Sequence, residues 1–308
     1  KGNVLGFLYL KTEDERESYT DITPAFKPMR RLKVGTFKVE ASGFRLGERF
    51  IKIIFDNAIE RHLNEIYVTL FMDRPELKAL YDLLTRWGFE KYGTKRTNEK
   101  DEVVLVKKLG VYNEALTLKQ NFPNIKYCHQ KFFLPIEAKY HTPLLPDSQL
   151  KTENEVDFLG DKPHRYALQK VYISFSYKRD MHPGDFLVLY RKGSTPGRKG
   201  YESVVSTIGV IDEVKYNFKN KEDFLKCCEN RTVFTPEELD SFWRTRRNTL
   251  LVIKFIFVKS LNSRLNLKHF WDNGLIPQNS GPRPFDTMTD DDFDSILHDS
   301  NTEIFVLR

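Results

Sequence analysis

Short strand-like runs alternate with amphipathic helical stretches over the first third of this chain, and this alternation constrains the fold most. The strand-like runs are rich in apolar, β-branched and aromatic residues, and the helical stretches place apolar side chains three or four positions apart. The expected strands are Asn3–Lys11, Arg31–Val39, Glu65–Phe71 and Glu102–Lys107, and the expected helices are Gly47–Arg61 and Arg74–Trp87. This order predicts an α/β layer, with helices packed on a sheet, that ends near Leu109.

The loop between Arg31–Val39 and the helix from Gly47 has the features of an anion site. Gly43 allows the backbone to approach a ligand closely, because no Cβ stands in the way. The helix N-terminus supplies backbone N–H groups and the positive end of the helix dipole. Arg45 and Arg49 add cationic charge at the same place. The alternative is a simple strand-to-helix connection that binds nothing.

The second half of the chain is dominated by strand-like runs separated by turns such as His182-Pro183-Gly184-Asp185. The expected strands are Phe132–Ile136, Val171–Ser176, Phe186–Tyr190, Tyr201–Glu213 and Leu250–Val258. Such a series is typical of a small barrel. Helices are expected over Lys221–Thr245 and in the acidic tail, where Thr289 marks the helix start. We therefore expect one domain over residues 1–109, a connector over 110–130 and a second domain over 131–308.

The segment Ser42-Gly43-Phe44-Arg45-Leu46-Gly47 resembles the R/Q-x-x-G-x-G/A loop of GNAT acetyltransferases. In this match Ser42 replaces the first Arg/Gln, Arg45 replaces the first glycine, and Gly47 fits. The resemblance implies an acyl-CoA N-acyltransferase that uses acetyl-CoA. The implied cofactor-binding residues are Val39, Gly43, Phe44, Arg45, Leu46, Gly47, Glu48 and Arg49. The first strand and first two helices of the family have no counterpart here, so the domain is expected to be incomplete at its N-terminus.

The segment from Ala79-Leu80-Tyr81 to Gly88-Phe89 resembles a second part of the GNAT pattern. The resemblance makes Tyr81 a candidate general acid for the leaving thiolate. By strict spacing Leu84 occupies that position, so Tyr81 as a core residue is the alternative. The resemblance also implies that Glu65–Phe71 splays from Arg31–Val39 to admit the pantetheine arm, with Tyr67 and Thr69 beside it.

A general base for an amine acceptor should be a carboxylate or a water held by one. Glu13 and Glu40 lie near the expected cleft and are the candidates. For each of them, a solvated surface position is the alternative.

The runs Val171-Tyr172-Ile173-Ser174, Pro183-Gly184-Asp185-Phe186-Leu187 and Gly209-Val210-Ile211 resemble PUA-like domains of the ASCH or EVE kind. The resemblance implies a mostly β barrel with helices that binds RNA. Aromatic and basic residues there are candidates for stacking on bases and contacting phosphates, and a place in the barrel core is the alternative for the tyrosines. The candidates are Phe175, Tyr177, Tyr190, Arg191, Lys192, Arg198 and Lys199.

Composition limits the remaining classes. The net charge is +6, which suits a protein that contacts phosphates or a solvated surface. Cys128, Cys227 and Cys228 have no metal-binding spacing, so we expect neither a metal nor disulfides, and a cytoplasmic protein. No apolar stretch is long enough to span a bilayer, so no membrane is expected. Proteins that join these two domain types in toxin–antitoxin and RNA-related systems suggest an upstream nuclease-like domain or an antitoxin partner.

These features predict an acyl-CoA-dependent N-acyltransferase that a PUA-like domain directs to RNA, with tRNA as one acceptor. Two alternatives stay open. One is a non-catalytic nucleic-acid-binding protein with a degenerate GNAT fold, and the other is a protein N-acetyltransferase.

Overall fold

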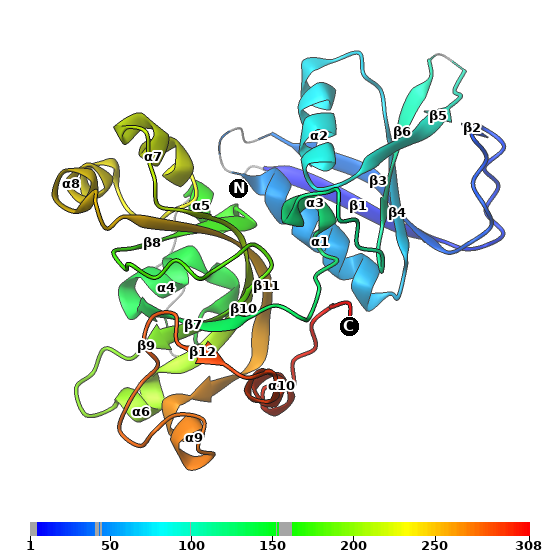
Figure 1. The fold of residues 1–308 in the computed structure, drawn as a ribbon. Coiled ribbons are helices and arrows are strands. Elements are labelled where there is room, and N and C mark those ends of the chain that lie inside the picture. The colour runs from blue at the N-terminus through cyan, green and yellow to red at the C-terminus, as the bar shows by residue number, and fades with distance from the viewer. Residues whose placement is uncertain (1–4, 41–42, 44, 99, 152, 154–161) are drawn as a thin grey trace. The chain divides into compact units, whose positions relative to one another are not determined.

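The computed structural model describes residues 5–40, 43, 45–98, 100–151, 153 and 162–308, in two compact units (Figure 1). Unit 1 comprises Lys1–Tyr127 together with Phe305–Arg308, and unit 2 comprises Cys128–Ile304. The end of the chain returns to unit 1, because the Leu307 N–H donates to the Ile125 carbonyl at 2.7 Å. Most of the segment expected as a connector therefore lies in unit 1, where α3 (Leu118–Asn121) is its helical part.

Unit 1 is built on a mixed six-stranded sheet in the order β1-β3-β4-β6-β5-β2. Its strands are β1 (Gly6–Glu13), β2 (Ile22–Thr23), β3 (Arg31–Val39), β4 (Glu65–Leu70), β5 (Glu90–Lys95) and β6 (Glu102–Lys108). β3 and β4 are parallel, and the other neighbours are antiparallel. The prediction of a mixed α/β layer is confirmed. β2 and β5 were not predicted, because β2 is two residues long and β5 is mostly polar.

The helices α1 (Leu46–Glu60) and α2 (Pro75–Arg86) follow the predicted amphipathic patterns. α1 packs on β1 and β3 and contacts α2. The apolar positions buried on α1 are Phe50, Ile51, Ile54, Phe55 and Ala58. α2 begins at a proline, which suits the first helical turn because the missing N–H would have no partner there. Gly88, just after α2, has φ +79°, and a Cβ there would lie 1.9 Å from the Gln120 carbonyl oxygen.

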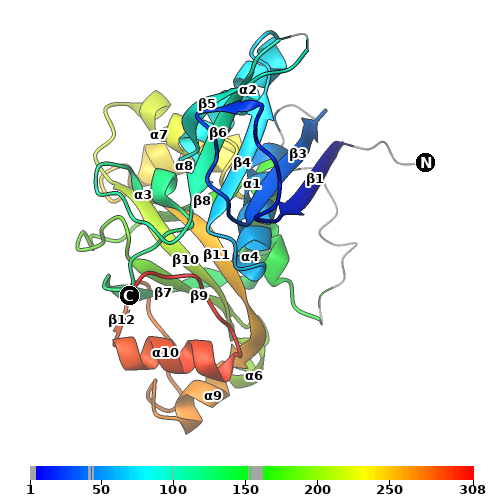
Figure 2. The same ribbon diagram turned by 90° about the vertical axis from the view of Figure 1, so that its right-hand side faces the viewer.

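The opposite face of this sheet is covered by the chain between β1 and β3 (Figure 2). That segment carries β2, and it packs an aromatic cluster against β4 and β6. The buried residues of the cluster are Tyr19, Ile22, Phe26, Tyr67, Val104 and Val106. The sequence pattern indicates a loop or hairpin tip for residues 12–19, whereas Tyr19 is buried here. The segment thus covers β4 and β6 on this face, while Phe7 and Tyr9 of β1 are exposed.

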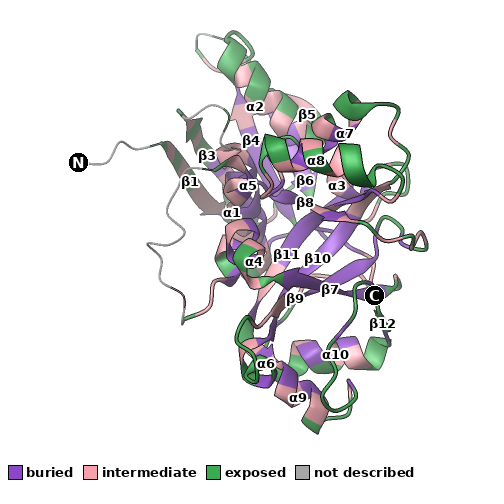
Figure 3. Cartoon of the chain, turned by 90° about the vertical axis from the view of Figure 1, so that its left-hand side faces the viewer, coloured by how far each residue is buried: buried purple, intermediate pink, exposed green. Residues whose placement is uncertain are grey.

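Unit 2 contains a second mixed six-stranded sheet, in the order β12-β7-β9-β10-β11-β8. Its strands are β7 (Lys131–Glu137), β8 (Gln169–Ser174), β9 (Phe186–Lys192), β10 (Val204–Lys215), β11 (Leu251–Asn266) and β12 (Thr287–Met288). β7 and β9 are parallel, and the other pairs are antiparallel. The strands β9, β10 and β11 form the buried centre (Figure 3).

The second half was predicted to be a mostly β barrel with helices, and its sheet is not closed into a barrel over the described residues. The sheet has two edges, β8 and β12, which do not pair with each other there. Helices cover the strands instead, so unit 2 is also mixed α/β. They are α4 (Ala138–Leu144), η1 (Pro146–Ser148), α5 (Pro163–Tyr166), α6 (Lys199–Glu202), α7 (Lys221–Cys228), α8 (Pro236–Arg246), α9 (Leu267–Asp272) and α10 (Asp290–Asp299). β8 lies in an apolar cluster with α7 and α8, and β12 is two residues long, so neither edge extends the sheet to closure.

The conformation of the turn before β9 explains why a glycine and an aspartate stand there. Gly184 has φ +99°, and a Cβ there would lie 2.7 Å from the His129 ring. The Asp185 carboxylate is buried and accepts the N–H groups of His182 at 2.6 Å and Gln130 at 3.2 Å. This motif therefore holds the start of β9 in place, and its role here is structural.

Candidate functional site

The most distinctive feature of unit 1 is a fork between the parallel strands β3 and β4. They pair over Leu32↔Ile66, Lys33↔Tyr67 and Val34↔Val68 only. β3 then continues for five residues, to Val39, and β4 continues for two. At the same place the register of β3 with β1 shifts, so that Gly35 is an extra residue of a β-bulge. Beyond the bulge, β3 no longer pairs with β4.

The segment after β3 leads into the N-terminus of α1. Val39 pairs with Gly6 at the end of β3, and Leu46 is the first residue of α1. Gly43 has φ +85° and open space at its Cβ position. Arg45, at the N-cap, has φ 55° and makes no side-chain cap hydrogen bond. The first-turn N–H groups and the dipole of a 15-residue helix are therefore directed at this loop.

Several residues predicted to bind the cofactor at this loop have structural roles within unit 1. A Cβ at Gly47 would lie 2.7 Å from Leu83 Cδ2, so this glycine allows α1 and α2 to approach. Glu48 is buried in the first turn of α1, and its carboxylate is 3.2 Å from Nη1 of Arg45. Arg49 is half-buried in the same turn. Phe44, also predicted to bind the cofactor, lies outside the described residues. Glu48 therefore places a negative charge where a phosphate would be attracted.

The structure brings Glu13 to the base of the fork. Its carboxylate is buried and accepts hydrogen bonds from the hydroxyls of Tyr67 at 2.6 Å and Tyr19 at 3.0 Å. Lys33 and Lys11 each place Nζ 3.3 Å from the same carboxylate. Tyr67 pairs with Lys33, one residue before the strands part.

Electrostatics keep this carboxylate ionised. Burial alone would raise the pKa of Glu13, but the hydrogen bond from Tyr67 and the charge of Lys33 hold that pKa below its usual value. Burial and the hydrogen bond to Glu13 raise the pKa of Tyr19 to about 12 and raise that of Tyr67 further. The cluster is therefore a carboxylate with two protonated phenols at neutral pH.

The other two predicted catalytic residues lie apart from this cluster. Glu40 is exposed and pairs with Lys38 Nζ at 2.6 Å, which lowers the pKa of its carboxyl group. Tyr81 is half-buried on α2, whereas Leu84 is fully buried. Thr69 is half-buried on the part of β4 beyond the fork, on the same face as Tyr67.

In unit 2 a cavity of about 590 Å³ opens between the loop after β9 and α9. We call it the Trp271 pocket, after one of its aromatic side chains. Its aromatic and cationic lining residues are Tyr190, Tyr201, Trp271, Lys192 and Lys199. A Cβ at Gly200 would lie 2.9 Å from the Trp271 ring, so the chain passes directly over that indole. The Trp271 Nε1–H donates to the Ser280 carbonyl at 2.7 Å, which fixes the ring.

The structure divides the residues predicted to bind nucleic acid. Tyr190, Lys192 and Lys199 line the Trp271 pocket, and Arg198 is exposed beside it on the loop before α6. Arg191 points to the other face of β9, where Nη2 pairs with the Glu153 carboxylate at 3.0 Å. Phe175 and Tyr177 follow β8 instead, and the Phe175 ring contacts Phe242 of α8. The sequence did not indicate Trp271, which lies outside any basic or glycine-rich run, or Tyr201, which was expected at the start of a strand.

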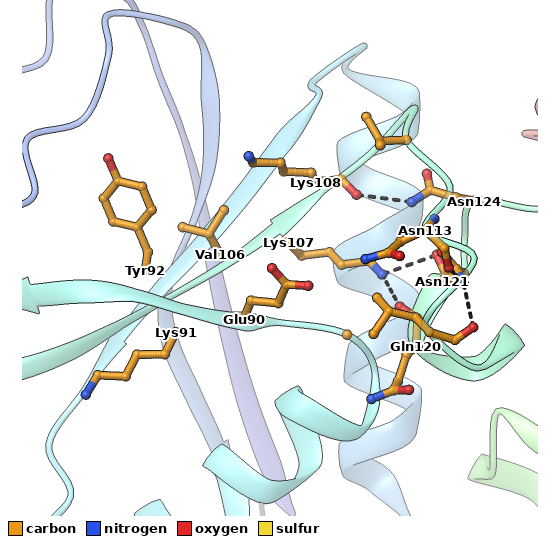
Figure 4. Close-up of a pocket in the computed structure, with 13 residues that line it drawn as sticks. Glu90, Lys91, Tyr92, Val106, Lys107, Lys108, Asn113, Gln120, Asn121 and Asn124 are labelled. Carbon is orange, nitrogen blue, oxygen red and sulfur yellow. Dashed lines mark hydrogen bonds between the residues drawn. The ribbon is translucent and has the colours of Figure 1, made fainter.

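Unit 1 also contains a cavity of about 210 Å³ beside β6, shown in Figure 4. Lys107 is buried there, and its Nζ donates to the carbonyls of Gln120 at 2.5 Å and Asn121 at 3.2 Å. These carbonyls belong to α3, so Lys107 holds the segment after β6 against the sheet. Burial lowers the pKa of Lys107 to about 7, against a smaller opposing effect of Glu90. No sequence motif marks this residue.

Lys107 should make the stability of unit 1 depend on pH. Its folded-state pKa is about 7 and its ordinary value is 10.5, so between these values the unfolded chain binds more protons. We expect the free energy of unfolding to rise by up to about 1.4 kcal/mol per pH unit from pH 7 to pH 10. In Lys107→Met this rise should be absent. Urea unfolding followed by Trp87 fluorescence, with Trp243 and Trp271 replaced by phenylalanine, measures it, and parallel profiles for the two proteins would refute it.

Within the described ranges, no group of His, Cys, Asp and Glu side chains could hold a metal ion. In the same part of the chain, none of the helices has the length and apolar character needed to cross a membrane.

Comparison with known proteins gives partial likenesses to solved structures. No protein-family model and no curated protein matches this chain. Among solved structures, one chain of the NatC complex bound to Gag peptide and CoA aligns with a TM-score of 0.27 and 20% identity. This likeness covers 34% of our chain and 61% of that one, so our chain spans less than two thirds of its length. A mutant ASCH protein from Zymomonas mobilis aligns with a TM-score of 0.36 and 6% identity, over 55% of our chain and 94% of that one.

Proposed function

We propose that unit 1 binds an acyl-CoA at the fork between β3 and β4, and that this chain transfers the acyl group to an amine. The fork itself is the observation that carries the proposal. Where β3 leaves β4 after Val34, its backbone edge is suited to pair with an extended chain carrying amides, as an added strand would. A pantetheine arm is such a chain, and the thioester that it carries supplies an activated acyl group.

The residues around the fork partly fit the cofactor. Gly43 has an open Cβ position, and the N-terminal turn of α1 is suited to a pyrophosphate. Val39, Leu46 and Gly47 form the two ends of the loop. The buried Glu48 carboxylate lies in the same turn, where it pairs with Arg45, and a carboxylate opposes an anion there.

Glu13 is our candidate for receiving the proton of the acceptor amine, because it is the carboxylate at the base of the fork. Tyr67 connects it to the point where the strands part, so a proton would pass through that hydroxyl. Glu40 is the more exposed candidate. Tyr81 is proposed as the acid that returns a proton to the leaving thiolate.

The proposal predicts that Tyr81→Phe lowers kcat about 100-fold and leaves KM nearly unchanged. The change removes only a hydroxyl from a half-buried ring, so the fold should be retained. Release of CoA from acetyl-CoA in the presence of amine acceptors measures kcat, with Tyr92→Phe as the matched control. An unchanged kcat would remove Tyr81 from the mechanism.

For unit 2 we propose RNA binding at the Trp271 pocket. The pocket combines stacking surfaces with Lys192 and Lys199, as an unpaired nucleotide with its phosphate requires. Arg198 extends the basic rim. The acyl acceptor would then be RNA, with tRNA as one such substrate.

The buried Glu48 favours a second candidate, a nucleic-acid-binding protein whose GNAT-like unit has lost its cofactor. Calorimetric titration of the full chain with acetyl-CoA separates the two. Saturable heat at micromolar concentrations supports the acyltransferase, and its absence supports the second candidate.

A further inference from the structure

A second aromatic and basic surface of unit 2 lies where β8 ends and α8 packs. We call it the α8 surface and define it by five side chains. These are Phe175, Phe242, Trp243, Arg246 and Arg247. Phe175 is 39% exposed, and Tyr177, two residues further along the chain, is 78% exposed. The surface is distinct from the sites proposed above.

The arginines of this surface are stacked on aromatic rings. The guanidinium carbon of Arg246 lies 5.8 Å from the centre of the Phe175 ring, and that of Arg247 lies 5.3 Å from the Trp243 ring. Neither arginine forms an ion pair with a carboxylate of the described residues, whereas Arg244 pairs with Asp240 at 3.0 Å. The stacking leaves the N–H groups of Arg246 and Arg247 available at an exposed face.

The rings are held in place from below. Phe242 meets Phe175 edge to face at 5.2 Å and meets Phe234 at 5.0 Å. Trp243 stacks on the buried Phe224 at 6.0 Å. Phe175 and Trp243 are therefore held in place and do not need to be ordered when a ligand binds.

The α8 surface and the Trp271 pocket lie at opposite ends of β11 (Figure 1). Leu251, at the start of β11, pairs with Ser174, the residue before Phe175. Leu267, which follows the last residue of β11, lines the Trp271 pocket. A 16-residue strand has a contour of about 50 Å, so one nucleotide cannot contact both places.

We infer that the α8 surface binds single-stranded nucleic acid, with Arg246 and Arg247 on phosphates and Phe175 on base faces. Cationic groups beside exposed rings suit an anionic strand with planar bases. Aromatic stacking accepts every base, so this surface should bind without sequence preference. It reads no 2′-hydroxyl, so RNA and DNA strands should bind alike. The inference shares its ligand class, a nucleic acid strand, with the RNA binding proposed above, and it rests on that proposal in no other way.

The test is fluorescence anisotropy of labelled dodecauridine RNA with the full chain, at several salt concentrations. Arg246→Ala/Arg247→Ala should lower the salt slope by about two units, because about one unit is lost per phosphate contact. Phe175→Ala should lower affinity about tenfold with little change in slope. Thymidine dodecamer DNA should behave in the same way as the RNA.

The matched control is Arg30→Ala/Arg96→Ala, which removes two exposed arginines from unit 1. An equal loss in this control would overturn the inference, because net charge alone would then explain binding. Displacement of RNA by polyglutamate of equal charge, with Phe175→Ala binding RNA normally, would also overturn it in favour of an acidic protein partner.

The same experiment separates this inference from the proposed function. Lys192→Ala/Lys199→Ala alters the Trp271 pocket alone. If it abolishes binding and the α8 variants do not, the inference fails and the proposed RNA site stands. If wild-type protein binds neither strand, both fail, while calorimetry with acetyl-CoA still tests the acyltransferase proposal. Acetyl-CoA affinity should be unchanged in the α8 variants.

Discussion

Gly47→Glu should lower the affinity of this chain for acetyl-CoA more than about 100-fold, through charge repulsion at the N-terminus of α1. The new carboxylate would stand beside that of Glu48, in the turn where we propose that the pyrophosphate binds. Isothermal titration calorimetry of the full chain measures the effect.

The matched control is Gly47→Ala, because any Cβ at this position meets Leu83 at 2.7 Å. Both variants carry that packing cost, and only the glutamate adds charge. We expect Gly47→Ala to bind acetyl-CoA with an affinity within a few-fold of wild type. Equal losses in the two variants would mean that the glycine serves helix packing and that the pyrophosphate is not held there.

Glu13→Ala should destabilise unit 1 by about 3 kcal/mol. The change leaves the hydroxyls of Tyr67 and Tyr19 without their acceptor in a buried place. Tyr19→Phe is the matched control and should cost about 1 kcal/mol, because it removes one of these hydrogen bonds. Urea unfolding followed by Trp87 fluorescence, with the other two tryptophans replaced, reports on unit 1. A loss below 1 kcal/mol in Glu13→Ala would contradict the central role of this carboxylate.

The pH dependence of this contribution follows from the lowered pKa of Glu13. A carboxyl group whose folded-state pKa lies below its ordinary value of 4.5 stabilises the fold above that value. The stabilisation is lost as pH falls through the folded-state pKa. Wild type should therefore lose stability in acid more steeply than Glu13→Ala.

Local sequence patterns predicted the elements around the site well. The spacing of Phe50, Ile54 and Ala58 predicted α1, and these side chains are buried as expected. Thr289 caps α10 by accepting the N–H of Asp292 at 3.1 Å, where the helix start was expected. In each case the signal lies within one turn of helix or a few residues of strand, so it can be read from the sequence.

Features that depend on distant contacts were not predictable in this way. β5 is mostly polar and forms because its backbone pairs with β6 and β2. The unit 2 sheet stays open because α7 and α8 pack with β8 at one edge and β12 is only two residues long at the other. The sequence shows only a series of short strands with turns, which is equally typical of a barrel. The burial of Glu48 depends on its placement in the first turn of α1, and composition alone indicates a solvated residue.

By itself, the sequence determined the principal strands and helices of unit 1, the glycine-containing loop before α1 and the basic and aromatic character of the second half. These depend on side-chain periodicity and backbone preference over short stretches. The tertiary structure decided which side chains meet. It placed Glu13 against Tyr67, 54 positions away. It separated Phe175, which follows β8, from Lys192, the last residue of β9, although both strands belong to one sheet. Pairing and packing between distant segments set those contacts, and such pairings leave no signal in the local order of residues.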